Sequence, residues 1–145
     1  MLIDHLSIIG VGLIGGSLAR ALRKAKLVGR VTGCNRSEET LKKAVQLGVI
    51  DDYSLDIYEA VKKSDVIVIG TPLAISEKLL PQIADSMSAN TVLTDVGSVK
   101  SGIVKAARQT LFEKFCNFVP GHPIAGTEKN GVEASIEDLF VNHRV

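Results

Sequence analysis

A short apolar run, a glycine-rich turn and the start of an amphipathic stretch follow one another near the beginning of this 145-residue chain. Residues 7–17 read SIIGVGLIGGS, with glycines spaced G-x-G-x-x-G. In such a setting each glycine has a separate duty. Gly10 permits a tight turn, Gly12 lets the backbone approach a diphosphate, and Gly15 lets the next helix pack closely on the strand. The pattern predicts a strand–turn–helix unit that accommodates a dinucleotide.

The helix after this turn supplies the second part of that prediction. It is expected to begin near Leu13 and Ile14, where its first N–H groups have no partner within the helix. These N–H groups and the positive end of the helix dipole favour phosphate groups. A glycine-rich turn alone can be purely structural, but the apolar run before it and the helical pattern after it favour dinucleotide binding.

Apolar strand-like runs alternate with helix-like stretches along the rest of the chain. The run DVIVIG at residues 65–70 is typical of a central parallel strand that is covered on both faces. Alternating strands and helices imply right-handed crossovers. The sequence therefore predicts one α/β domain over residues 1–145, with a Rossmann-type, doubly wound, mainly parallel sheet of strand order 3-2-1-4-5-6 and helices on both faces. The expected strands are residues 6–10, 30–34, 51–54, 65–70, 91–95 and 117–120, and the expected helices are residues 14–25, 37–47, 56–63, 74–86 and 99–111.

Composition excludes several classes of function. Apolar residues make up 46% of the chain and the net charge is only +1, so no basic surface for nucleic acid is indicated. No apolar run approaches the ~20 residues that cross a bilayer, and Asp4 and His5 argue against a signal peptide. Cys34 and Cys116 show neither metal-ligand spacing nor a disulfide framework, so no metal site is predicted and a cytoplasmic setting is expected. Cys34 falls beside the expected ribose site, which makes its alkylation worth testing.

The residues after the second expected strand bear on the choice of dinucleotide. An acidic side chain normally binds the adenosine ribose of NAD at this point, but here the sequence reads Asn35-Arg36-Ser37. Uncharged Asn35 removes the repulsion between a carboxylate and a 2′-phosphate, while Arg36 and Ser37 supply donors. NADP is therefore the preferred cofactor and NAD remains possible. The alternative is that Arg36 is a solvated loop residue and Ser37 only a helix cap.

Ligands of such sheets bind beyond the carboxyl ends of the strands. Thr71 and Pro72 follow the fourth strand, and Thr71 is a candidate contact for the nicotinamide ribose or the diphosphate. Asp95, Gly97 and Ser98 follow the fifth strand, and the first two are further predicted to contact the cofactor. The default role of Asp95 or Ser98 is to cap the next helix, although the hydroxyl of Ser98 would also lie near the centre of hydride transfer.

His122 is the candidate catalytic base. It follows the sixth strand, between Gly121 and Pro123, on the side where the cofactor is expected. A loop histidine is more often structural, but imidazole is the side chain best suited to accept a proton near neutral pH. His5 and His143 lie near the ends of the chain and have no comparable claim.

Three segments together resemble the prephenate/arogenate dehydrogenase family, also called cyclohexadienyl dehydrogenases. They read GVGLIGG at residues 10–16, TDVGSVK at residues 94–100 and GHPIAGTEKNG at residues 121–131, and the resemblance extends over essentially the whole chain. It implies NAD(P)-dependent oxidative decarboxylation in tyrosine biosynthesis. In this family pattern His122 takes the proton of the substrate hydroxyl, Ser98 orients His122, and Thr127 and Glu128 line the mouth of the substrate pocket.

The resemblance also implies a helical second domain after residue 145 that forms a homodimer and completes the substrate site. The chain alone is therefore expected to bind cofactor and to be nearly inactive. Two other functions remain open at this point. One is a β-hydroxyacid or 6-phosphogluconate type dehydrogenase, which shares the fold and a similar Asn-Arg-Ser run. The other is a non-catalytic module that senses NAD(P), in which His122 and Ser98 would have no purpose.

Overall fold

The computed structural model describes residues 1–145 and contains a single parallel sheet. The strand order is β3-β2-β1-β4-β5-β6, and every neighbouring pair is parallel. This order confirms the Rossmann-type prediction. The strands are β1 (Ile3–Ile9), β2 (Val28–Cys34), β3 (Asp52–Ser54), β4 (Val66–Ile69), β5 (Val92–Asp95) and β6 (Phe118–Pro120).

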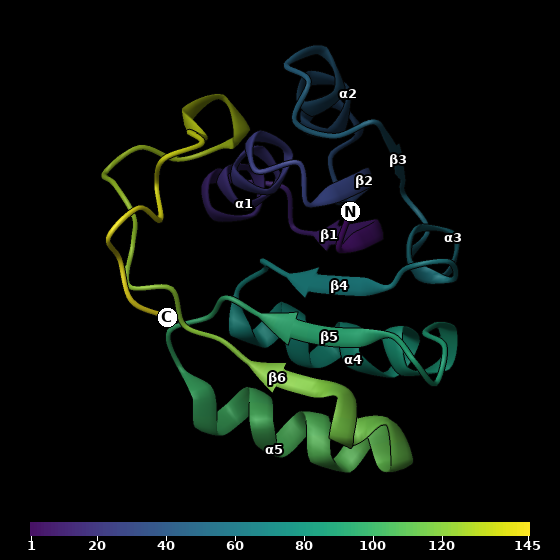
Figure 1. Cartoon of the computed structure of the whole chain (residues 1–145). Helices are drawn as coiled ribbons and strands as arrows, with labels where there is room; N and C mark the ends of the chain where they lie inside the picture. The colour runs from purple at the N-terminus through teal and green to yellow at the C-terminus, as the bar shows by residue number, and fades with distance from the viewer.

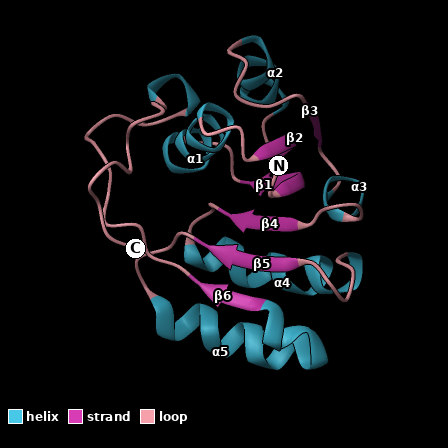
Figure 2. Cartoon of the chain, in the orientation of Figure 1, coloured by secondary structure: helices cyan, strands magenta, loops and turns pink.

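Five α-helices cover the two faces of the sheet (Figure 1). Their bounds lie within a few residues of those expected, and two short 3-10 helices, η1 (Phe112–Asn117) and η2 (Val132–Ala134), were not predicted. Figure 2 shows that long loops are concentrated after β6. No helix has the length and apolar character that crossing a membrane requires. The α-helices are α1 (Leu13–Lys24), α2 (Glu38–Gln46), α3 (Ile57–Val61), α4 (Leu73–Ser86) and α5 (Lys100–Leu111).

The side chains of adjacent residues in the central strands point into two separate hydrophobic cores. Ile8 points into a core that contains Leu41 of α2 and Val132 of η2. Ile9 points into the opposite core, which contains residues of α3, α4 and α5. Because successive side chains of a strand alternate between faces, the apolar run of β1 is buried on both sides. The carboxyl ends of all six strands consequently meet at one edge, which is where Figure 1 shows the loops that follow them.

The segment after β6 crosses this edge and returns to α1 (Figure 1). Ser17, fully buried in α1, accepts the backbone N–H of Ile136 at 3.0 Å, and Arg20 donates to the hydroxyl of Ser135 at 2.9 Å. A Cβ on Gly16 would lie 3.0 Å from the Cβ of Ser135, so the glycine leaves room for this contact. Gly16, which lies outside the G-x-G-x-x-G spacing, therefore permits the docking of the return segment on α1.

Candidate functional site

The turn between β1 and α1 has the geometry that its glycines predict. Gly10 adopts φ +96°, and a Cβ there would lie 2.7 Å from the carbonyl carbon of Gly70. A Cβ on Gly15 would lie 2.8 Å from a methyl group of Ile8, so this glycine allows α1 to pack directly on β1. Both positions exclude larger residues on steric grounds.

Gly12 differs from these two glycines because a Cβ there would meet nothing within 4 Å. It is the N-cap of α1 and supplies no side-chain cap. The first N–H groups of the helix, at Leu13 and Ile14, therefore have no side-chain cap and lie beside open space. This is the arrangement that a diphosphate requires, so the residues present fit a dinucleotide.

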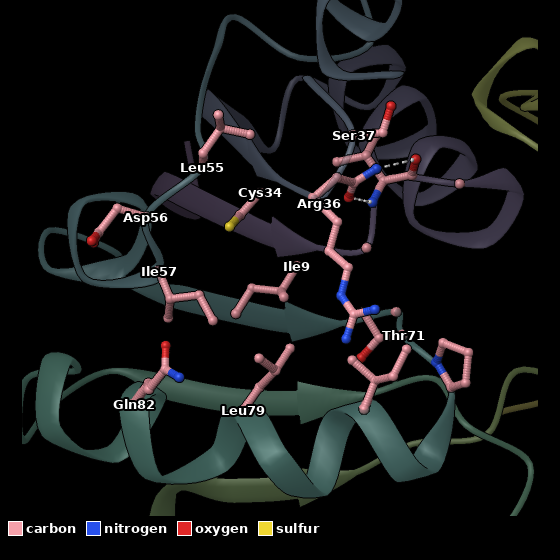
Figure 3. Close-up of a pocket in the computed structure, with 17 residues that line it drawn as sticks. Ile9, Cys34, Arg36, Ser37, Leu55, Asp56, Ile57, Thr71, Leu79 and Gln82 are labelled. Atoms are coloured by element: carbon pink, nitrogen blue, oxygen red, sulfur yellow. Dashed lines mark hydrogen bonds between the residues drawn. The ribbon is translucent and has the colours of Figure 1, made fainter. Parts of the chain in front are cut away.

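A groove of about 590 Å³ continues from this turn across the sheet (Figure 3). It runs between the ends of β1 and β2 on one side and α4 on the other. The groove brings together most of the residues predicted to bind the cofactor. These are Gly10, Gly12, Asn35, Arg36, Ser37, Thr71 and Pro72.

Asn35 has a role that sequence reasoning missed. Its side-chain oxygen accepts the backbone N–H of Val11 at 2.6 Å, and its amide nitrogen donates to the backbone oxygen of Val11 at 3.3 Å. The side chain thus bridges the end of β2 to the glycine-rich turn. Its amide thereby holds the turn in place, while the predicted effect of Asn35 on the choice of dinucleotide stays a prediction.

Arg36 and Ser37 have different surroundings. The side chain of Arg36 is exposed and extends along the groove toward Thr71 (Figure 3). Ser37 is the N-cap of α2 and accepts the backbone N–H of Thr40 at 3.3 Å. The capping role of Ser37 is therefore present, and Arg36 is the cation that faces the groove.

A second groove, of about 240 Å³, lies where β4 and β5 end. It brings Thr71 and Pro72 together with Asp95, Gly97 and Ser98, as their positions after neighbouring parallel strands predicted. Thr71 forms a 2.9 Å hydrogen bond with the hydroxyl of Ser76, and Pro72 is the N-cap of α4. Thr71 lines both grooves and so lies between the two.

The expectation that Asp95 or Ser98 caps the next helix is wrong. The N-cap of α5 is Val99, and no side chain caps it. Asp95 is buried and turns instead toward the loop after β6. It accepts backbone N–H groups of Gly97 at 3.0 Å and Gly121 at 3.3 Å.

Lys100 completes this arrangement, and nothing in the sequence beyond its place in TDVGSVK pointed to it. Its ammonium group pairs with the carboxylate of Asp95 and donates to the backbone oxygen of Gly121 at 2.6 Å. Both polar groups of the Gly121 backbone are thereby held by this ion pair. Because His122 is the next residue, the Asp95–Lys100 pair fixes the start of the loop that carries the candidate base.

His122 is half-buried at the start of this loop, and Ser98 is exposed in the loop between β5 and α5. No hydrogen bond joins the two side chains, so the predicted orientation of His122 by Ser98 stays a prediction. Thr127 and Glu128 are exposed farther along the loop, and Thr127 accepts the backbone N–H of Lys129 at 3.1 Å. Neither residue lines the two grooves described above.

Cys34 lies on the floor of the larger groove and is only 4% exposed. Burial, with a smaller contribution from the nearby Asp56 carboxylate, raises the pKa of its thiol from 9.0 to about 11. Such a shift leaves about 100-fold less reactive thiolate at a given pH.

We expect iodoacetamide at pH 8 to modify the exposed Cys116 at least about tenfold faster than Cys34, and bound dinucleotide to slow the modification of Cys34 further. Mass spectrometry of both thiols measures this, and equal rates would contradict the placement of Cys34.

The sheet order, the glycine-rich turn and the groove beyond it define a Rossmann-type nucleotide-binding domain. Residues 18–145 match the family model described as "Prephenate dehydrogenase, nucleotide-binding domain". The chain therefore belongs to the prephenate dehydrogenase family, which confirms the resemblance seen in the three sequence motifs and decides against the β-hydroxyacid alternative.

Individual relatives agree with this assignment. The chain is 39% identical over 140 residues to a prephenate dehydrogenase of Bacillus subtilis and 33% identical over 141 residues to a cyclohexadienyl dehydrogenase of Zymomonas mobilis. These alignments cover 96% and 97% of this chain but only 38% and 47% of the relatives. The chain thus spans less than half the length of these two proteins.

Solved structures show the same similarity. A prephenate dehydrogenase from A. aeolicus, in complex with hydroxyphenyl propionate and NAD+, superimposes with a TM-score of 0.89 at 32% identity. An arogenate dehydrogenase from Synechocystis superimposes with a TM-score of 0.85 at 32% identity. The matches cover 99% and 96% of this chain and 49% and 48% of those structures.

Proposed function

We propose that this chain is the NAD(P)-binding part of a dehydrogenase that oxidises and decarboxylates prephenate or arogenate. The observation that carries the proposal is the meeting of two features at one edge of the sheet. The open space at Gly12 continues into the groove that Thr71 lines, and Thr71 also lines the groove of Ser98. The loop of His122 begins at the same edge, where it is tied to Asp95 and Lys100.

The bound nicotinamide supplies a hydride acceptor, and the chain's own residues handle binding and the proton. In the proposed reaction the C4 hydroxyl of the substrate gives its proton to His122 while hydride leaves C4, so a ring carbonyl forms. The ring carboxylate then leaves as CO2, and its bonding electron pair completes the aromatic ring as a phenolate, which takes a proton back. Because aromatisation drives the loss of CO2, one base suffices for the acid–base chemistry.

The helical second domain, the homodimer and the substrate contacts of Thr127 and Glu128 are part of this proposal. The chain spans 38% of the Bacillus subtilis relative, whose remaining length is available for further substrate contacts. We therefore expect the 145-residue chain to bind dinucleotide but to turn over prephenate poorly.

The test compares this chain with the longest gene product that contains it. Reduced nicotinamide is followed at 340 nm with prephenate or arogenate as substrate, and CO2 release is measured in parallel. The proposal expects equimolar reduction and CO2 release in the longer protein and little turnover in the 145-residue chain. Comparable rates would contradict the expected second domain. A longer protein that binds dinucleotide without turnover would instead support a sensing module.

We further propose that NADP is preferred over NAD. The support is the Arg36 guanidinium that faces the groove, together with the absence of a carboxylate at Asn35. Arg36→Met is expected to weaken NADP binding by roughly tenfold to 100-fold, the scale of a lost charge-assisted hydrogen bond, and to leave NAD nearly unchanged. Calorimetric titration of both dinucleotides measures the two affinities.

Lys43→Gln is the matched control because Lys43 is an exposed cation of α2 outside this groove. It removes the same charge and should alter both affinities only slightly, because salt screens the interaction of a distant exposed charge with the cofactor. Tighter binding of NAD than NADP by the unmodified chain would remove the NADP preference and leave the rest of the assignment intact.

A further inference from the structure

The larger groove extends well beyond the residues assigned to the ribose. Arg36 and Thr71 lie at one end of it, and at the opposite end the groove has apolar walls (Figure 3). One wall comes from the β3–α3 connection and the other from α4, and the floor is made by β1 and β2. The apolar residues of this end are Leu55 and Ile57 on one wall, Leu79 on the other, and Ile9 and Cys34 on the floor.

Two polar side chains lie at this apolar end, and neither was singled out by the sequence motifs. Asp56 comes from the β3–α3 connection, and the amide of Gln82 rises from α4 toward Ile57 on the opposite wall (Figure 3). Asp56 uses its Oδ1 atom to accept the backbone N–H of Glu59 at 2.9 Å. Its second carboxylate oxygen and the side-chain amide of Gln82 form no hydrogen bond within the chain. Both groups are therefore available to a ligand.

We infer that Asp56 and Gln82 make this end of the groove selective for adenine over hypoxanthine, a purine that carries a carbonyl oxygen in place of the amino group. The inference rests on the proposed function, because a diphosphate at Gly12 and a ribose near Arg36 direct the base into this end of the groove. Apolar walls suit the faces of a planar ring, and its polar edge then meets Asp56 and Gln82.

The two side chains contribute differently to this selectivity. A glutamine amide pairs with the amino group and adjacent ring nitrogen of adenine, since it offers one acceptor and one donor side by side. It can also rotate and pair with the reversed pattern of hypoxanthine. An ionised carboxylate only accepts hydrogen bonds, so Asp56 attracts the adenine amino group and repels the carbonyl oxygen of hypoxanthine. Asp56 is thus the specificity-determining residue, and Gln82 adds affinity.

Deamino-dinucleotides, in which hypoxanthine replaces adenine, test the inference directly. Titration calorimetry with the 145-residue chain compares whichever of NAD and NADP binds more tightly with its deamino form. The unmodified chain is expected to bind the deamino form about tenfold more weakly. Asp56→Asn should reduce this ratio to about twofold or less, because an asparagine amide can donate a hydrogen bond to the carbonyl oxygen of hypoxanthine. Asparagine also keeps the N-cap of α3, so the fold is retained.

Asp85→Asn is the matched control, since it removes one exposed carboxylate of α4 that does not line the groove. It should leave the ratio of affinities unchanged. Gln82→Leu, an exposed substitution on α4, should weaken both forms by about threefold to tenfold and preserve their ratio.

Equal binding of both forms by the unmodified chain would overturn the inference while leaving the proposed function standing. An unchanged ratio in Asp56→Asn, with the discrimination moved by Gln82→Leu instead, would also overturn the role given to Asp56. Failure of the chain to bind any dinucleotide would contradict the proposed function itself, and the inference would fall with it.

Discussion

Replacing His122 with asparagine in the enzyme that contains this domain is expected to lower kcat by about 10²–10⁴-fold, the usual scale for loss of a general base. Asparagine keeps a hydrogen-bonding side chain but accepts no proton near neutral pH. Because His122 lies outside the cofactor groove, the dissociation constant for dinucleotide should change little. Steady-state kinetics and a cofactor titration on the same variant separate the two effects.

His5→Asn is the control for this experiment. His5 lies near the start of β1, at the end of the sheet opposite to His122. Its ring forms a 2.8 Å hydrogen bond with the hydroxyl of Thr32. Its replacement should leave kcat unchanged. A His122→Asn variant with near-normal turnover would reduce His122 to a structural residue and leave the proposed reaction without its base.

Replacing Lys100 with methionine is expected to destabilise the chain by about 2–3 kcal/mol. The change leaves the buried Asp95 carboxylate without its cation, and removing one partner of a fully buried pair costs about 3–5 kcal/mol. We expect less than this because the Lys100 side chain is 29% exposed and two backbone N–H groups still reach Asp95. Urea denaturation gives the free energy of unfolding.

Two further variants identify the cause of such a loss. Lys105→Met changes an exposed lysine of the same helix that forms no ion pair, so its effect should be within about 0.5 kcal/mol. Asp95→Asn combined with Lys100→Met removes both charges and should recover part of the lost stability. If Lys100→Met were as stable as the unmodified chain, the ion pair would not hold the loop of His122 as described.

The sheet and the glycine-rich turn were predictable because their signals are local. Runs such as DVIVIG identify buried strands, and alternation with helices leaves few possible topologies. The spacing of Gly10, Gly12 and Gly15 predicts the geometry of the turn from only six consecutive residues. Bounds were less certain where pairing overrides local preference. β1 begins at Ile3 and not at Leu6 because Ile3 and His5 pair with β2 despite the polar residues there.

The contacts that complete the site were not predictable because each joins residues distant in the sequence. Asn35 reaches back to Val11 in the turn, and Lys100 reaches forward to Gly121. Local preference favoured a helix-capping role for Asp95, yet its burial and the approach of Gly121 gave it different partners. Asp56 and Gln82 carry no motif at all, and only the fold brings them to the same groove.

A crystal structure of this chain with NADP bound would show whether the nicotinamide meets the candidate base. We expect the diphosphate at the N–H groups that follow Gly12 and the 2′-phosphate near Arg36. We expect the nicotinamide ring beside Ser98, with the His122 imidazole facing it. A nicotinamide ring bound away from the ends of β5 and β6, or an imidazole of His122 directed into the protein interior, would contradict the assignment.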